Sequence, residues 1–376
     1  MTSTSVPRPH DRLHESRSRT VHLGVDLSDA GARPAVWRAV GSQAQRLFDP
    51  QRLVELVATA RRGRLDLVTF DDAFSLQPVR RGAQGRLDAA LVAARVAPRS
   101  SGIGLVPTVD TTHTEPFHVS KAITTIDHVS EGRAAWQVGR STAAEAIDVV
   151  SKLWDAGEND AGSRDVRAGR LADDVTLDHE GVRFVKKVPS IAPRSPQGRP
   201  PVVIRVTSPE ALDLAARRAD VVRVRATSLG EAAALRTEIL DRAEAAGRGR
   251  SELRVLVEAF VVIGDDARSA HARLDLLEQL DGATWDTDSL IHAGTAQALS
   301  ALVAEWVLLG AADGFLLRPA SLTTDLTAIV DRTVPLLQEA GLFRTEYPGT
   351  TLRETLGLPR PASRYATLPA RAAATA

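Results

Sequence analysis

The chain has 376 residues, of which 43% are hydrophobic, and this is enough to build one large core. Its 47 lysine and arginine residues balance 47 aspartate and glutamate residues, so no overall field draws the protein to nucleic acid or to an anionic membrane. It contains no cysteine, which excludes disulfides, thiolate metal sites and cysteine nucleophiles. We therefore expect a small-molecule substrate, and any redox chemistry must come from a cofactor.

The beginning of the chain has no apolar segment of the kind that a secretory signal needs. Residues 1–19 are polar and rich in serine and arginine, and we predict that they form a disordered leader. The most apolar long stretch, Ala301 to Ala312, carries Glu305 at its centre and is too short to cross a bilayer. The sequence therefore predicts a cytoplasmic protein with no membrane partner.

Short β-rich runs alternate along the chain with longer stretches of helical periodicity. This alternation is typical of parallel strands joined by crossover helices. Eight such runs can be counted in chain order: Val21 to Leu27, Leu65 to Phe70, Ser101 to Thr108, Arg133 to Gly139, Pro201 to Val206, Ala219 to Ala226, Arg254 to Ile263 and Asp313 to Ala320.

The segments between these runs carry good helix signals. One helix is expected to start at Ser208 as N-cap, with Pro209 at the first helical position and Glu210 in the first turn. Eight strand and helix repeats close most naturally into a (β/α)8 TIM barrel, which is the predicted fold class. An open doubly wound sheet is the alternative.

Two segments interrupt the alternation of strands and helices. We expect insertions at Gly157 to Pro200, after the fourth helix, and at Asp281 to Gly294, in the seventh unit. The barrel domain is predicted to span residues 20–345. Residues 346–376 are predicted to form a C-terminal extension that is partly disordered.

Side chains at the carboxyl ends of barrel strands point into the active site, so the residues just past each run are the candidates. Asp71 and Asp72 follow the second run, Thr108 to Glu115 the third, Trp136 to Ser141 the fourth and Val206 to Ser208 the fifth. This set is rich in hydroxyl and amide groups and lacks a catalytic triad or a metal cluster. Such a set is better suited to binding a polar heterocycle than to catalysing hydrolysis.

Simpler interpretations stand beside these. Asp71 and Asp72 are also typical of a loop start, and Trp136 is also typical of a strand core. The three histidines at 113, 118 and 128 do not share a helical face as metal ligands would, so no metal site is predicted. No glycine-rich phosphate loop follows a strand, which argues against a dinucleotide fold or a nucleoside triphosphatase.

The run HTEPFHVSKAITTIDHVSEGRAAWQVGRS, from His113 to Ser141, resembles the bacterial-luciferase-like flavin-dependent oxidoreductases. The resemblance is greatest to the branch with nitrilotriacetate and dibenzothiophene-sulfone monooxygenases. In that branch an EPxHxA-type helix leads through LDxxSxGRxGW to a strand that ends in serine. Further matches follow in order: SKLWDAGENDA, PSIAPRSPQGRPPVVI, DGFLLRP and GLFRTEYPGTTLRETLGLPRP. Together, all the matches extend from Asp66 to Pro361.

The resemblance implies a (β/α)8 barrel that uses reduced FMN and oxygen on a small organic substrate through a flavin C4a-peroxide. It also implies a separate flavin reductase as partner, and a homo-oligomer. Two other functions stay open: hydride transfer with a 5-deazaflavin on the same fold, and a barrel subunit without cofactor or catalysis.

By correspondence with the branch, Asp72, Thr108 and Trp136 would line the isoalloxazine ring, with Gln137 where asparagine is usual. Ser141 and Ser208 would reach the phosphate, Ser208 at a helix N-terminus that suits a dianion.

The sequence departs from the branch at this phosphate end. Val206 and Ala211 replace two glycines, and Arg140 replaces a threonine. A phosphate-binding loop and helix are deleted between Ser141 and Ile147. Arg140 would either pair with the phosphate or lie on the surface.

Overall fold

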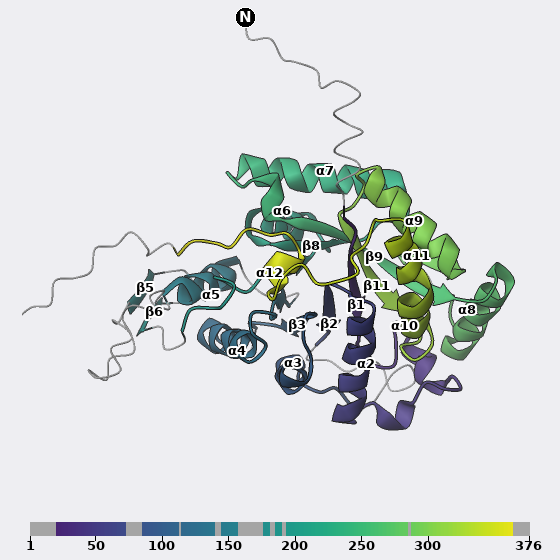
Figure 1. Ribbon diagram of the computed structural model, residues 1–376. Coiled ribbons are helices and arrows are strands. Elements are labelled where there is room, and N and C mark those ends of the chain that lie inside the picture. The colour runs from purple at the N-terminus through teal and green to yellow at the C-terminus, as the bar shows by residue number, and fades with distance from the viewer. Residues whose placement is uncertain are drawn as a thin grey trace, which may run out of the picture.

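The computed structural model describes residues 20–72, 85–112, 114–139, 144–156, 176–180, 185–189, 193–284 and 287–363. Eight parallel strands form a closed sheet surrounded by helices (Figure 1). The order around the ring is β1-β2-β3-β4-β7-β8-β9-β11, and β11 pairs with β1 to close it. The predicted (β/α)8 barrel is therefore confirmed, and the closed pairing excludes an open sheet.

The eight barrel strands coincide with the eight predicted runs. They are β1 (His22–Asp26), β2 (Leu67–Phe70), β3 (Gly104–Val109), β4 (Trp136–Val138), β7 (Val202–Arg205), β8 (Val221–Val224), β9 (Arg254–Ile263) and β11 (Gly314–Pro319).

Helices cover the outside of the ring and connect its strands. The longer ones are α2 (Pro50–Arg62), α3 (Ala89–Val96), α4 (Pro116–Val129), α5 (Ala144–Ala156), α6 (Pro209–Arg218), α7 (Leu229–Ala245), α8 (Ala267–Asp281) and α9 (Ala296–Leu308). After β11 the chain forms α10 (Asp325–Ala328), the π-helical turn η5 (Ile329–Thr333), α11 (Val334–Glu339) and, separately, α12 (Leu352–Thr355). Short 3-10 turns are η1 (Pro34–Arg38), η2 (Ala44–Arg46), η3 (Ala97–Arg99) and η4 (Arg250–Glu252). Among the residues that the structure describes, no helix is both long and apolar enough to cross a membrane.

Both predicted insertions contain strands of their own. The first holds an antiparallel hairpin, β5 (Thr176–Glu180) and β6 (Val185–Pro189). The second ends in β10 (Leu290–Gly294), which pairs in parallel with the last five residues of β9 and lies outside the ring of eight. The predicted leader lies outside the described residues, and the domain limits at 19 and 345 stay predictions.

The helix starts follow from capping chemistry. Asp49, Ser208 and Asp266 each accept a hydrogen bond from a first-turn N–H of α2, α6 and α8, which satisfies a donor that has no partner within the helix. Proline follows the cap in α2 and α6, where its missing N–H costs nothing. The sequence signals at Ser208 and Pro209 are thus confirmed as a helix start.

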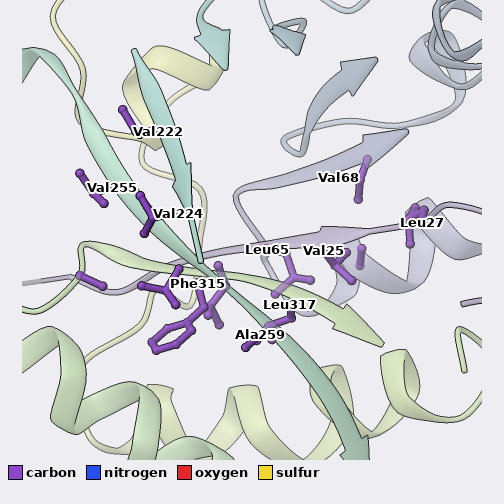
Figure 2. Packing of buried hydrophobic residues seen from close by; sticks show 14 of the residues in the cluster. Val25, Leu27, Leu65, Val68, Val222, Val224, Val255, Ala259, Phe315 and Leu317 are labelled. Atoms are coloured by element: carbon purple, nitrogen blue, oxygen red, sulfur yellow. The ribbon is translucent and has the colours of Figure 1, made fainter. Parts of the chain in front are cut away.

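The main apolar core lies between the strands and the helices. Outward-facing side chains of neighbouring strands pack there, among them Val25, Val224, Phe315 and Leu317, all nearly free of solvent exposure. Figure 2 shows these side chains on their strands, with helices at the lower edge of the view. Because every strand also buries its inner face, the runs read as almost continuous apolar segments.

A second apolar cluster fills the amino-terminal end of the barrel lumen. Seven strands contribute inward-facing side chains, and Leu352, Leu356 and Leu358 from the C-terminal segment close this cluster from below. On β1 the inward position is occupied by Gly24. A larger residue does not fit there, because an added Cβ would collide with the side chains of Leu67 and Leu316. The C-terminal signature of the sequence therefore seals the bottom of the barrel.

Asp127 of α4 binds the segment of Ser195 and Gln197 and the chain just before β4 at this closed end. Its side chain accepts hydrogen bonds from Ser195 Oγ at 2.6 Å, Gln197 Nε2 at 2.7 Å and the Ala134 backbone N–H at 3.0 Å. Gln197 Oε1 in turn accepts the backbone N–H of Arg353. Burial raises the pKa of Asp127 to about 6, and the hydrogen bonds offset that rise only in part.

Replacing Asp127 with Asn tests this buried carboxyl. At pH values between the ordinary pKa of an aspartate and about 6, the native state binds the proton on Asp127 more tightly than the unfolded chain does. Raising the pH through this range therefore lowers the stability of the natural protein. We expect the free energy of unfolding of D127N relative to the natural protein to rise by roughly 2–3 kcal/mol from pH 4 to pH 7. Urea unfolding at several pH values measures it, and a difference independent of pH would contradict the assignment.

Candidate active site

Each of the eight strands has two inward-facing positions that are two residues apart. The first position holds a small or apolar residue, and the second holds a polar one. Side chains two apart lie on the same face of a strand, so these pairs follow one another up the lumen. The pairs are Gly24 and Asp26, Leu67 and Thr69, Val106 and Thr108, Ala135 and Gln137, Val203 and Arg205, Val221 and Arg223, Leu256 and Glu258, and Leu316 and Arg318. The second members form a polar ring toward the carboxyl ends of the strands, where barrel active sites lie.

Glu258 is the centre of the charged half of this ring. Its Oε1 lies 2.7 Å from Arg205 Nε and 2.9 Å from Arg223 Nη2, and its Oε2 lies 3.7 Å from Arg318 Nη1. Burial alone would raise the pKa of Glu258, but the three guanidinium groups outweigh it and hold that pKa at about 2. The carboxylate is therefore ionised at neutral pH.

Asp26 is the second buried carboxylate of the ring. Its Oδ2 lies 3.5 Å from Arg318 Nε, and its Oδ1 accepts the backbone N–H of Ser28. Burial raises the pKa of Asp26, yet Arg318 and Arg223 bring it below its ordinary value. Arg318 itself stacks on the Phe260 ring, 4.6 Å from the centroid.

A directed chain of hydrogen bonds crosses from the charged half to the β2–β3 side. Arg223 Nη1 donates to Gln137 Oε1, Gln137 Nε2 donates to Thr108 Oγ1 at 2.5 Å, and Thr108 Oγ1 donates to Asp71 Oδ1 at 3.2 Å. Asp71 also borders a cavity of about 60 Å³ between the ends of β1 and β2. The chain fixes the orientation of the amide and the hydroxyl, as a binding wall requires.

Two of the predicted site residues, Thr108 and Gln137, meet in this wall. Asp72 lies beside it, where Oδ2 accepts the backbone N–H of Ala89 at the start of α3. The structure thus brings together two of the residues expected around a flavin ring, whereas Asp72 serves a helix start.

The predicted phosphate end is described only in part. Ser208 caps α6 by accepting the N–H of Ala211, and the backbone N–H of Val206 donates to the carbonyl of Arg223. Arg140 and Ser141 lie outside the described residues. Their contact with a phosphate therefore stays a prediction.

Trp136 points to the opposite side of β4. Its ring is fully buried in the outer core, lies edge-on to Trp154 with a centroid distance of 6.2 Å, and donates from Nε1 to the carbonyl of Val109. This matches the interpretation of Trp136 as strand core. A contact with a flavin ring stays a prediction, and the side-chain direction does not favour it.

The N-terminus of α6 already carries an acidic side chain. The Ser208 hydroxyl and the backbone N–H of Glu210 lower the pKa of the Glu210 carboxyl, so both donors serve that carboxylate. A phosphate at this helix end would have to displace Glu210, which is exposed and free to move.

The two arginines at the end of α6 and His128 have local partners. Arg217 pairs with Asp213 and Arg218 with Asp148 on the exposed face of α6, as expected of a solvated helix face. His128 contacts the carbonyl of Pro193. Within the described ranges, no group of three histidine or acidic side chains could hold a metal ion.

Sequence reasoning missed all five charged residues of the ring, namely Asp26, Arg205, Arg223, Glu258 and Arg318. A signal was present, because Arg205, Arg223 and Arg318 are each the only charged residue of their strand, and Glu258 has apolar residues on both sides. A charge in a strand that is buried on both faces has to face the lumen or a partner, and this marks a site.

Replacing Glu258 with Gln is expected to destabilise the fold by about 3–5 kcal/mol, because three buried guanidinium groups lose their counter-charge. Urea unfolding at pH 7 measures the change. Glu238→Gln is the matched control, since Glu238 forms an exposed pair with Arg242 on α7 and its loss should change little. Equal effects of both changes would refute the central role of Glu258.

Several known proteins similar to this chain are monooxygenases. A family model described as luciferase-like monooxygenase matches residues 31–321. The chain is 28% identical to N-acetyl-S-(2-succino)cysteine monooxygenase of Bacillus subtilis (strain 168) over 438 residues, which cover 93% of this chain and 99% of that protein. It is also 28% identical to nitrilotriacetate monooxygenase component A of Aminobacter aminovorans, over 92% of this chain and 98% of that protein.

Solved structures show the same architecture. EDTA monooxygenase from Chelativorans sp. BNC1 superposes with a TM-score of 0.82 and 24% identity, covering 91% of this chain and 99% of that one. DmoA from Hyphomicrobium sulfonivorans gives a TM-score of 0.80 and 22% identity, covering 93% and 94%. The chain therefore belongs to the luciferase-like monooxygenase family and is an enzyme of that class.

Proposed function

We propose that the protein is a monooxygenase that uses reduced FMN and molecular oxygen on a small organic substrate. The observation that carries the proposal is the oriented wall of Gln137, Thr108 and Asp71 at the carboxyl end of the barrel. Amide, hydroxyl and carboxylate groups in fixed directions suit the carbonyl and N–H edge of an isoalloxazine ring. Membership of the family supports the same cofactor class.

The residues present fit the ring part of a flavin. The Thr69 hydroxyl is buried and has no hydrogen-bond partner among the described residues, so it is available to a ligand. When bound, reduced flavin would supply the electrons with which oxygen is split, one atom entering the substrate and the other leaving as water. The protein's own groups would hold the ring and exclude solvent. The order of steps on the flavin stays a prediction from the resemblance.

We also propose that reduced flavin reaches this protein from a separate reductase. One relative is named as component A of nitrilotriacetate monooxygenase, and two relatives from Streptomyces pristinaespiralis are named as separate parts of one pristinamycin IIA synthase. These names support a division of labour between chains. A homo-oligomer and a cytoplasmic location stay predictions.

The functional test is anaerobic titration with reduced FMN, followed by mixing with oxygen and measurement of flavin reoxidation. A protein-dependent change in the reoxidation rate supports the proposal. Tight binding of a 5-deazaflavin without FMN binding would favour hydride transfer instead, and failure to bind either cofactor would leave the cofactor-free subunit.

Replacing Thr108 with Val removes one hydroxyl of the wall with little change in shape. We expect FMN to bind about tenfold more weakly, equivalent to roughly 1–2 kcal/mol, because Gln137 and Asp71 lose their common partner. Fluorescence quenching of FMN measures the affinity. Thr125→Val, on the exposed face of α4, is the control and should bind FMN as the natural protein does.

Replacing Ser208 with Ala tests the phosphate end separately. If Ser208 reaches the phosphate, S208A should bind FMN more weakly by roughly 1–2 kcal/mol and leave riboflavin binding unchanged. Riboflavin serves as the internal control, because any loss of α6 stability through the missing cap would weaken both ligands. Equal loss for both ligands would remove Ser208 from the phosphate site.

A further inference from the structure

The charged half of the polar ring has more positive than negative groups. It comprises the guanidinium groups of Arg205, Arg223 and Arg318 and the carboxylates of Asp26 and Glu258, so three positive charges face two negative ones. At the rim, Asp71 adds a carboxylate, and Arg225 pairs with Asp288. We infer that the cluster binds the carboxylate group of an organic acid substrate. This inference rests on the proposed function and names its substrate class.

Unused donors in the cluster point to a ligand. Among the described residues, Nη2 of Arg205 and Nε of Arg223 have no hydrogen-bond partner although both atoms are buried. Glu258 Oε1 is already shared by these two arginines. A guanidinium group offers a planar fork of donors that matches the two oxygens of a carboxylate. An incoming carboxylate would therefore use the donor of Arg205 that the protein itself leaves free.

The degree of exposure shows from which side a ligand can arrive. The side chains of Glu258 and Arg223 are 0% and 1% exposed, whereas those of Arg205 and Arg318 are 9% and 18% exposed. The guanidinium group of Arg318 also lies over the Phe260 ring. The anion would approach Arg318 and Arg205 from the open mouth, with Arg223 and Glu258 as the support beneath.

Within this cluster, Arg318 and Glu258 are separated from the proposed flavin wall, whereas Arg223 contacts that wall through Gln137. Thr108 and Gln137 belong to β3 and β4, whereas Arg318 and Glu258 belong to β11 and β9, on the far side of the ring order. A substrate anchored on the arginines would therefore extend across the mouth toward the flavin. The arrangement anchors one end of the substrate and leaves the other for reaction.

Stability alone does not account for such a cluster. Replacing buried ion pairs by apolar residues of similar size is often neutral or stabilising, so three arginines in a lumen gain little for the fold. A binding role explains the free donors.

The test uses acetate as probe, because it carries a carboxylate without a particular skeleton. We expect acetate, but not uncharged acetamide, to raise the melting temperature of the full-length protein in a saturable way at constant ionic strength. Arg318→Gln should abolish the acetate effect and Arg318→Lys should retain part of it. Arg332→Gln, which removes an exposed pair with Asp265, should leave the acetate effect unchanged. Equal effects of acetate and acetamide, or an unchanged acetate effect in R318Q, would overturn the inference.

Flavin binding by the same variants separates this inference from the proposed function. R318Q should bind FMN and riboflavin as the natural protein does. If R318Q loses FMN affinity and keeps riboflavin affinity, the cluster holds the cofactor phosphate and the substrate assignment is overturned. If the natural protein binds acetate but no flavin, the anion site stands and the proposed function fails.

Discussion

Closure of the parallel sheet decides where each inward-facing side chain of this protein lies. Once β8 pairs with β9 and β11 with β1, alternate residues of every strand must point into a lumen too narrow for solvent. The lower inward positions are small or apolar and are sealed by Leu352 and its neighbours. The upper positions are polar on all eight strands. The same closure thus produces an apolar base and a polar mouth.

The segments that carry the family resemblance do much of the sealing at the closed end. Gln197, in the stretch SPQGRP, binds Asp127 and the backbone of Arg353. In the C-terminal signature, Arg344 pairs with Asp66 at 2.7 Å, and the Tyr347 hydroxyl donates to the carbonyl of Leu65. These contacts serve the scaffold. The segments also contribute to the mouth, because Arg318 lies in DGFLLRP and Arg223 donates to Gln137 of the run from His113 to Ser141.

The charged cluster also shows what the scaffold must tolerate. Glu258 stays ionised only because three guanidinium groups surround it, and Arg223 keeps its charge although burial lowers its pKa to about 10. A low-dielectric lumen strengthens each of these attractions and makes each unpaired donor costly. Strands rather than loops hold the charges, so their positions are rigid.

Local periodicity and capping were enough to predict the barrel, its eight strands, the two insertions and the start of α6, because short segments carry these signals alone. The pattern also pointed to Thr108 and Gln137 at strand ends. That Trp136 faces the helices while Gln137 faces the lumen emerged from the three-dimensional arrangement, since the face of a strand follows from register and closure. The meeting of Arg205, Arg223 and Arg318 around Glu258 likewise joins strands far apart in the chain, and local pattern does not encode that meeting.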